Sequence, residues 1–497
     1  MDRPRRSLIL AGGGMRVAYQ AGVLRALDEA GLAFDHADGT SGGIINLAML
    51  LSGQTPEEMC QRWRGVDVRK FASFLPLHEY LDVGRLPALG DADGIREDVF
   101  PALGIDVARI RDADGPAGTF NVGNFNRKVS EAIPHQEISL DLLVAGISLP
   151  IFTPPVRLGE TYYLDAVWIR DANLMEAVRR GAEELWVVWC IGNANQYRDG
   201  PFEQYVHMIE LSANGSLFGE LERIAELNDR IRAGEAVGGR TTPIRLHLIK
   251  PSLPLPLDPD LYLGRIDCAT LIAMGYQDAQ HYLDTIDPEG LPLGPEVTKM
   301  RDPRLGISFR EVMAGGFSLG ATDPRAGREA GEAAGTTLTM RAAIDIDDLD
   351  RFIEDPDHRG RLSGTVSFPP LGEDLLASSG VFNLFSPGDE PGTRRMVYEL
   401  GLRHQGRELY LAGHKEVKDD FGPDLVSDTT TLFTSLHEGP DASGPVIGAG
   451  TLRLGIRELK HLVGTMHATN AAGAREAAEA LARFGRFFLG ELWKAYI

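Results

Sequence analysis

A serine flanked by glycines is the feature of this sequence best suited to chemistry. Ser41 lies in the segment 39–43 (GTSGG), where glycines remove the side chains that would clash in a sharp turn from a strand into a helix. Residues 42–51 (GGIINLAMLL) are typical of a buried helix, whose first N–H groups and positive dipole end would favour a negative charge beside the Ser41 oxygen. The pattern indicates a nucleophile for acyl transfer or ester hydrolysis.

A run of three glycines upstream supplies a place to hold an oxyanion. Gly12, Gly13 and Gly14 follow a short apolar run, residues 7–11 (SLILA), and precede a helical pattern. Bare glycine amides can approach a ligand oxygen closely, and each preorganised donor of an oxyanion hole contributes about 2.7 to 4 kcal/mol. We therefore expect the three glycines to form the oxyanion hole.

A dinucleotide-binding fingerprint is the rival interpretation of the same loop. That motif, G-x-G-x-x-G, needs a third glycine where this chain has Val17, so only two of its three positions fit. No other cofactor motif accompanies it, and we expect no cofactor and no metal.

The amino-terminal segments resemble those of patatin-like phospholipases. The resemblance rests on residues 11–31 (AGGGMRVAYQAGVLRALDEAG), 37–53 (ADGTSGGIINLAMLLSG), 145–156 (AGISLPIFTPPV) and 162–167 (YYLDAV). It implies a three-layer α/β/α fold and a Ser-Asp dyad in which Asp165 accepts the proton of Ser41. It also implies a lipid or other acyl ester as substrate, with transient contact with a membrane.

Two positions depart from the family pattern, which has glycine where this chain has Val17 and Ala166. A β-branched residue tolerates positive φ poorly, so we expect a loop of different shape beyond Arg16. Arg16 itself either orients an acidic group of the substrate or packs on the first helix.

A histidine triad is the mechanistic alternative to the dyad. The order Ser, Asp, His could be completed by His207 or His247, although neither lies in a recognisable motif.

Composition narrows the class of protein. The formal net charge of -21 argues against nucleic acid as a partner and against steady attachment to anionic lipid. The three cysteines are widely spaced and indicate neither a disulfide framework nor a zinc site. The apolar run at residues 7–11 is too short for a signal peptide, and we expect a cytoplasmic protein.

Alternating strands and helices predict an α/β domain over residues 5–287, followed by a linker rich in proline and glycine at 288–300. Residues 301–497 carry short β-branched and aromatic runs between turns, which predict a mostly antiparallel sandwich or barrel. Apolar residues at helical spacing predict a terminal helix over 471–496.

The second half resembles a module that accompanies cholesterol-oxidase-like flavoproteins. The resemblance rests on residues 340–372 and 412–439. Because no flavin motif is present, it implies an association with sterol or lipid chemistry and no redox activity.

Three hypotheses follow for function. The first is a serine lipid acyl hydrolase, a phospholipase or esterase that uses Ser41 and Asp165. The second is an acyltransferase that uses the same dyad to pass the acyl group to an alcohol or thiol. The third is an inactive lipid-binding or scaffold protein, motivated by Val17 and Ala166.

Overall fold

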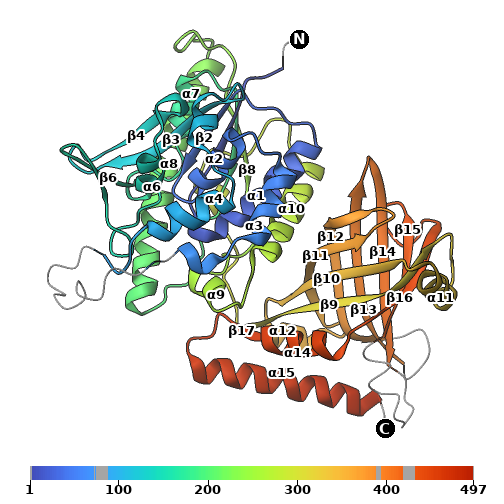
Figure 1. Cartoon of the computed structure of the whole chain (residues 1–497). Coiled ribbons are helices and arrows are strands. Elements are labelled where there is room, and N and C mark those ends of the chain that lie inside the picture. Colours follow the sequence, from blue (N-terminus) through green and yellow to red (C-terminus); the bar gives the residue numbers. More distant parts are fainter. Residues whose placement is uncertain (1–2, 72, 74–87, 388–392, 418–430, 496–497) are drawn as a thin grey trace. The chain divides into compact units, whose positions relative to one another are not determined.

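The computed structural model describes residues 3–71, 73, 88–387, 393–417 and 431–495 (Figure 1). Part of the stretch 412–439 therefore lies outside the described residues. The chain divides into two compact units, residues Met1–Asp302 and Pro303–Ile497.

The first unit is built on a mixed sheet of eight strands, ordered β5-β6-β3-β2-β1-β7-β8 with β4 paired to β3. Its parallel strands are β1 (Arg6–Leu10), β2 (His36–Thr40), β3 (Ala117–Asn124), β7 (Glu184–Val188) and β8 (Arg245–Ile249). Its antiparallel strands are β4 (Val129–Pro134), β5 (Val156–Leu158) and β6 (Thr161–Asp165). Strands β1, β7 and β8 are mostly apolar. Strand β2, with the sequence HADGT, is fully buried although most of its residues are polar or small.

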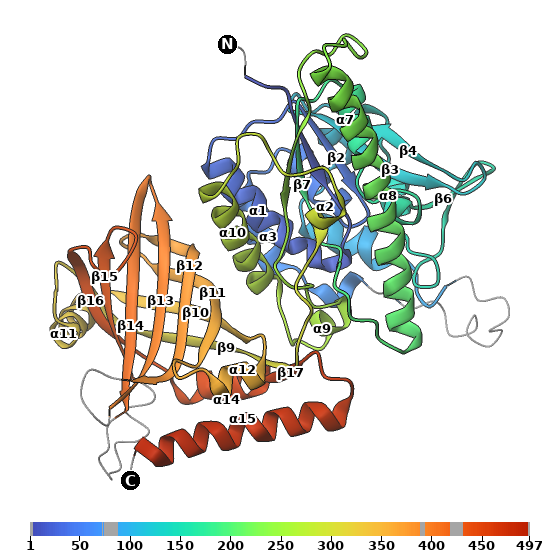
Figure 2. The ribbon, with the colours of Figure 1, turned by 180° about the vertical axis from the view of Figure 1, so that it is seen from behind.

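Helices cover both faces of this sheet. One face is covered by α1 (Ala18–Glu29), α3 (Pro56–Gly65) and α10 (Cys268–Asp284), in the foreground of Figure 1. The other face is covered by α7 (Leu174–Arg179) and α8 (Pro201–Arg232), in the foreground of Figure 2. Along α8, Leu217, Leu221 and Ile224 are fully buried in the same core as Ile9 and Leu185 of the sheet. The layered α/β fold expected from the sequence is therefore confirmed.

Residues 288–300, expected as a linker, pack on the first unit. The amide of Leu291 donates to Leu246 O at 2.7 Å, and the amide of Met300 donates to Asn193 O at 2.9 Å. Thr298 is fully buried and its hydroxyl donates to Asn214 of α8. The division between the two units falls just after this segment, at Asp302.

The second unit is a closed antiparallel barrel of eight strands. Neighbouring strands follow one another in sequence from β9 to β16, and β9 pairs with both β10 and β16, which closes the ring. The strands are β9 (Gly306–Leu319), β10 (Thr337–Ile346), β11 (Arg359–Phe368), β12 (Gly372–Pro387), β13 (Arg394–His404), β14 (Arg407–Val417), β15 (Thr431–Glu438) and β16 (Val446–Arg453). Of the two architectures expected for this half, the structure is the barrel.

The terminal helix is present as α15 (Ala474–Ala495). Its Phe484 is buried with the barrel core, at 6.3 Å between ring centroids from Phe309 of β9. Phe487 packs edge-on against Phe352 of α12 (Leu349–Glu354). The helix thus adds aromatic side chains to the barrel core.

Candidate active site

Ser41 occupies a strained turn between a strand and a helix. It follows β2 directly and precedes α2 (Gly43–Leu51), and its φ of 52° lies in the left-handed region. Such a conformation is uncommon outside glycine and is kept only where the surroundings enforce it. Ser41 is 5% exposed. The geometry is that of a nucleophile held at a tight elbow in front of a helix N-terminus.

The glycine loop lies against this elbow. A Cβ built on Gly12 would lie 2.8 Å from Ser41 Cβ, and a Cβ on Gly42 would lie 2.5 Å from Gly14 O. Only glycine permits backbone this close. The structure therefore brings Gly12, Gly13 and Gly14 together with Ser41.

A buried carboxyl that the sequence analysis did not identify holds the first of these glycines. The Gly12 amide donates to both carboxylate oxygens of Asp171, at 3.0 and 3.1 Å. Asp171 has no exposed surface, and a Cβ on Gly12 would overlap its Oδ1. The Gly12 amide is thus engaged, which leaves the other two glycine amides as the loop's donors.

A second, partly buried carboxyl holds the far side of the loop. Asp258, at the start of α9 (Asp258–Tyr262), accepts a hydrogen bond from the Met15 amide at 3.0 Å. The Arg16 guanidinium donates to Gly13 O at 2.9 Å, and this side chain is buried. The side chain thus braces its own loop, and a role of Arg16 in orienting an acidic group of the substrate stays a prediction.

The loop beyond Arg16 does not need a glycine. Val17 has a φ of -66°, an ordinary helical value, and its carbonyl accepts a hydrogen bond from Asn46. Val17 therefore avoids the positive φ that a β-branched residue tolerates poorly.

Backbone donors without an acceptor gather at the elbow. Within the described part of the chain, the amides of Gly13, Gly14 and Gly42 have no hydrogen-bond acceptor. Gly42 is the residue after Ser41 and the N-cap of α2. Donors of this kind, next to a nucleophile, suit an oxyanion.

Asp165 is the last residue of β6, and its carboxyl lies near the Ser41 hydroxyl. Its amide donates to Ser148 O at 3.0 Å, and its Oδ1 accepts from the Val167 amide at 2.9 Å. Burial is complete and raises the pKa of Asp165 to about 7, although the Ser41 hydroxyl and the Val167 amide lower it in part. A carboxyl with such a pKa is a much better proton acceptor at neutral pH than an ordinary aspartate.

The contact between Ser41 and Asp165 is loose. The hydroxyl is near enough to lower the pKa of the carboxyl, but among the described residues Oδ2 of Asp165 has no hydrogen-bond partner of regular geometry. Catalytic hydrogen bonds are often long before substrate binds, so this geometry is compatible with a dyad.

The charge of Asp165 affects the pKa of Asp171. Burial, and then the charge of Asp165, raise the pKa of Asp171 to about 8. Arg16 and the Gly12 amide act in the opposite direction. Near neutral pH both carboxyls therefore hold a proton more readily than an ordinary aspartate does.

A buried polar network supports the elbow from below. Asn121 of β3 donates to Asp38 and, at 2.8 Å, to the Thr40 hydroxyl, and it accepts from Asn173 at 2.9 Å. The network thus ties the residue before Ser41 to the loop that carries Asp171. Burial raises the pKa of Asp38 to about 7. The one sequence signal for this network is the run of polar residues in β2, which has too few apolar side chains for a buried strand.

Neither histidine considered for a triad joins the site. His247 stacks on Trp186 with ring centroids 4.3 Å apart and bonds to the Tyr282 hydroxyl at 2.9 Å. His207 accepts from the Arg198 amide and contacts Glu210. These partners include neither Ser41 nor Asp165, so the structure does not support the triad.

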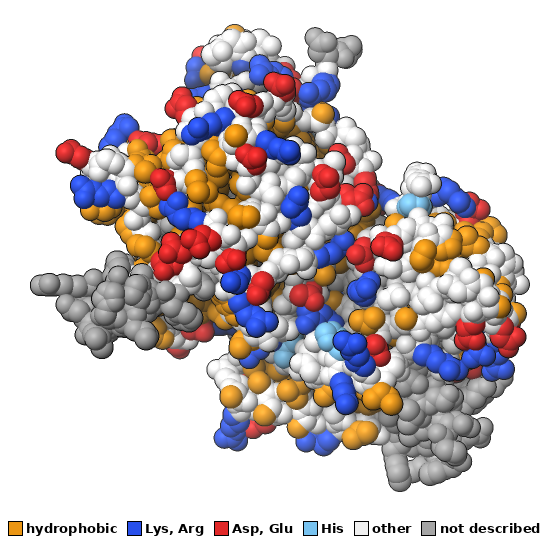
Figure 3. All heavy atoms as spheres, viewed as in Figure 1, with side chains coloured by type: hydrophobic (Ala, Val, Ile, Leu, Met, Phe, Trp, Pro, Cys, Tyr) orange, Lys and Arg blue, Asp and Glu red, His pale blue; other side chains and the backbone are white. Residues whose placement is uncertain are grey.

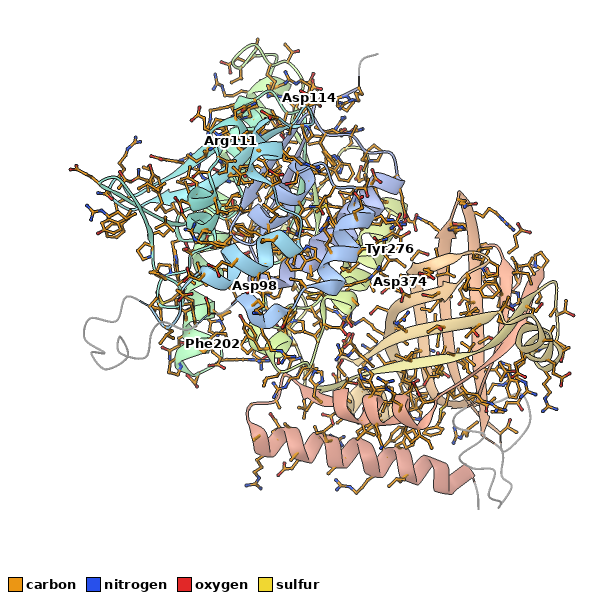
Figure 4. The ribbon with its side chains drawn as sticks, in the orientation of Figure 1. Asp98, Arg111, Asp114, Phe202, Tyr276 and Asp374 are labelled. Carbon is orange, nitrogen blue, oxygen red and sulfur yellow. The ribbon has the colours of Figure 1, made fainter. Side chains whose placement is uncertain are left out.

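An aromatic wall stands beside Asp165. Tyr205 of α8 packs against Phe152 and Trp168, with ring centroids 5.1 and 5.5 Å apart. Burial, and then the charge of Asp165, raise the pKa of Tyr205, so the phenol lies near that carboxyl. Phe202, marked in Figure 4, meets Phe152 edge-on at the start of α8.

Partly exposed apolar side chains continue this wall to the surface. The Leu89 and Gly90 amides donate to the carbonyls of Ile151 and Phe152, which fixes the rim. Its exposed members are Leu89 (51%), Ile151 (57%), Phe152 (36%) and Ile169 (36%). We call these four residues the apolar rim.

The described residues contain no group of three or more His, Cys, Asp or Glu side chains placed to hold a metal ion. Within the same ranges, no helix has the length and apolar character needed to cross a membrane.

Part of the first unit is similar to a known family. Residues 8–178 match the family model for patatin-like phospholipase. Two curated relatives are uncharacterized NTE family proteins, Rv2565 of Mycobacterium tuberculosis (strain H37Rv) and Mb2594 of Mycobacterium bovis. Each is 30% identical over 173 residues, which cover 34% of this chain and 27% of the relative. The chain thus matches about a quarter of the length of these relatives.

Two solved structures are similar to this chain at a low level. VipD from Legionella pneumophila has a TM-score of 0.31 at 12% identity, over 57% of this chain and 67% of that one. The type III effector protein ExoU has a TM-score of 0.20 at 13% identity, over 60% of this chain and 77% of that one. The first unit therefore has a patatin-like α/β fold, and the similarity to the family lies in residues 8–178.

Proposed function

We propose that the first unit hydrolyses the carboxylic ester bonds of lipids, with Ser41 as nucleophile and Asp165 as base. The observation that carries the proposal is the placement of a serine with positive φ beside a fully buried carboxyl and a set of unengaged glycine amides. The patatin-like family match over residues 8–178 supports the same class of reaction.

The first half-reaction forms an acyl-enzyme. Asp165 takes the proton of Ser41, and the hydroxyl oxygen bonds to the ester carbonyl carbon, so that the carbonyl electron pair moves onto its oxygen. The amides of Gly13, Gly14 and Gly42 donate to that oxyanion. When the carbonyl reforms, the bond to the alcohol breaks, and the leaving alkoxide takes the proton from Asp165.

The second half-reaction uses water in place of the alcohol. Asp165 removes a proton from water as the water oxygen attacks the acyl carbon. The tetrahedral species then expels the Ser41 oxygen, which recovers its proton, and the carboxylic acid leaves. If an alcohol or thiol took the place of water, the same residues would perform acyl transfer, the second candidate from the sequence.

Apolar surroundings favour a fatty acyl group as the part of the substrate next to the dyad. The wall of Phe152, Trp168 and Tyr205 adjoins Asp165, and the apolar rim continues it to solvent. Burial of an acyl chain against such a surface contributes roughly 0.8 kcal/mol per CH₂ group. We therefore expect long-chain esters to be better substrates than acetyl esters.

Covalent labelling with a fluorophosphonate probe tests the proposal. We expect stoichiometric labelling of the native chain, measured by intact mass, and none of Ser41→Ala. We expect slow or no labelling of Asp165→Asn, together with loss of p-nitrophenyl ester turnover. Ser216→Ala and Asp229→Asn, which lie on α8, serve as matched controls. A folded native protein that neither labels nor turns over esters would refute hydrolysis and favour the third hypothesis, an inactive lipid-binding protein.

A further inference from the structure

Two hairpin turns of the first unit form one projecting tip. Residues 125–128 join β3 to β4, and residues 159–160 join β5 to β6. Both views show these turns standing out from the body of the sheet, at the left of Figure 1 and the right of Figure 2. We call residues 125–128 and 157–162 the hairpin tip.

Hydrogen bonds lock the two turns together. The Phe125 amide donates to Tyr162 O at 2.9 Å, and the Tyr162 amide donates to Asn126 Oδ1 at 2.9 Å. Asn126 Nδ2 also donates to Glu160 O at 3.2 Å. The tip is therefore a single ordered surface rather than two independent loops.

Each turn exposes an aromatic ring covered by a cation. Lys128 Nζ lies 3.1 Å from the ring centroid of Phe125, and Arg157 Cζ lies 5.7 Å from that of Tyr162. Phe125 is 53% exposed and Tyr162 is 40% exposed. In the described part of the first unit, both cation–π contacts lie on this tip.

The cation at the first turn is held at a conformational cost. Lys128 has a φ of 60°, a value that glycine or asparagine adopts more easily than lysine does. A backbone outlier at an exposed position motivates a functional explanation. Here the outlier places an ammonium group over an exposed aromatic ring.

The charge of the tip contrasts with that of the chain. At the tip there are three cationic side chains, Arg127, Lys128 and Arg157, and two carboxylates, Glu131 and Glu160. The tip therefore has a small positive charge, whereas the whole chain has a net charge of -21. Figure 3 shows Lys and Arg side chains beside hydrophobic ones on this projecting part of the first unit. Exposed aromatic rings interleaved with cations suit the head-group layer of a phospholipid membrane.

We propose that the hairpin tip docks the first unit on the surface of a phospholipid membrane. Lys128 and Arg157 would pair with lipid phosphates, while Phe125 and Tyr162 enter the head-group layer. Strand β6 begins in the tip and ends at Asp165, so docking brings the dyad to within roughly 10 Å of the tip along three residues of strand. The inference rests on the proposed function, because a lipid hydrolase needs access to its substrate.

Vesicle co-sedimentation tests the inference. The native chain is mixed with vesicles of phosphatidylcholine containing phosphatidylglycerol, and separately with vesicles of phosphatidylcholine alone. We expect binding to the first and weaker binding to the second, because only the first adds an anionic surface. Phe125→Ser/Lys128→Glu should lower binding by at least about tenfold, and Arg157→Gln on the neighbouring turn should lower it as well.

Controls separate docking from folding and catalysis. Tyr197→Ser/Arg109→Glu removes a comparable aromatic ring and cation, which are 68% and 73% exposed, and should bind as the native chain does. Hydrolysis of a soluble short-chain ester should be unchanged in the tip variants, and their unfolding transitions should match the native one.

Several outcomes would overturn the inference. These are native-like vesicle binding by both tip variants, equal binding of the native chain to both kinds of vesicle, or no vesicle binding by a chain that still cleaves soluble esters. The last result would leave the proposed function standing. Vesicle binding that depends on the tip in a chain without esterase activity would instead keep the docking surface and refute the proposed function.

Discussion

Neutralising Asp165 should stabilise the first unit, and by an amount that depends on pH. In the unfolded chain this carboxyl ionises near its ordinary pKa of 3.8, whereas burial raises its pKa in the fold to about 7. Between these values the folded form keeps a proton that the unfolded form has lost, so stability falls as pH rises through this window. Above about pH 7 the loss is complete.

The size of the effect follows from the two pKa values. A difference of about three pKa units corresponds to about 4 kcal/mol of unfolding free energy. Asp165→Asn keeps the shape of the side chain and the acceptor for the Val167 amide but carries no charge. We therefore expect this variant to exceed the native chain by up to about 4 kcal/mol at pH 8 and by almost nothing at pH 4.

Urea unfolding followed by tryptophan fluorescence measures this difference, because four of the five tryptophans lie in the first unit. Both pH values lie away from the isoelectric point of about 5.0, where the chain is least soluble. Asp229→Asn, an exposed carboxyl on α8, should show no such pH dependence. A variant whose advantage is the same at pH 4 and pH 8 would refute the reasoning that burial of Asp165 costs stability.

Three further predictions concern the same site. Hydrolysis by the native chain should fall about tenfold per pH unit below pH 7, because only ionised Asp165 accepts a proton. Measurement of kcat/KM for a soluble ester from pH 5 to 9 checks this, and a flat profile would contradict it. Gly12→Ala should lower probe labelling by about a hundredfold or more, since its Cβ overlaps Asp171 and lies 2.8 Å from Ser41 Cβ; labelling at the native rate would show that the loop has room to move. Asn121→Ala should lower the unfolding free energy by about 2 to 4 kcal/mol, because it leaves buried polar partners unpaired. A loss under about 1 kcal/mol in urea unfolding would show that the network does not stabilise the fold.

The sequence predicts a functional residue best when the residues that define its role are adjacent to it in the chain. The elbow at Ser41 and the glycine loop are local patterns, and the structure places them together. Asp171 could not be found in this way, because a lone aspartate six residues after Asp165 is typical of a turn or helix cap. Its role depends on Gly12, which is distant in sequence.

Sequence patterns also fail to predict strands that are buried although their side chains are polar. Strand β2 carries Asp38, which is buried because Thr119 and Asn121 of the next strand satisfy it. A search for apolar runs passes over such a strand. In the second unit, alternating residues predict strands but not their closure, because a sandwich and a barrel have the same local pattern and differ in the partner of β9.

Residues 288–300 show what composition leaves out about packing. Proline and glycine indicate a connecting segment, and they give no sign that Leu291 and Thr298 bond to the first unit. The resemblance of the second half to a module of cholesterol-oxidase-like flavoproteins, and with it any association with sterol chemistry, stays a prediction.

The closure of the barrel has a consequence for the order in which the second unit folds. Strands β10 to β16 each pair with a neighbour in sequence, so their hairpins can form as the chain emerges, whereas β9 must wait for β16 to complete its second edge. Pairing of strands so far apart in the sequence is slow, because the chain loses the entropy of loop closure before the stabilising contacts form. During synthesis part of the free edge of β9 therefore stays open until Arg453 is available, and its first residues, 306–308, pair later still, with the short strand β17 (His467–Thr469). Pulse-labelled hydrogen exchange on the refolding chain should find the amides between β9 and β16 among the last to be protected, and their early protection would contradict this order.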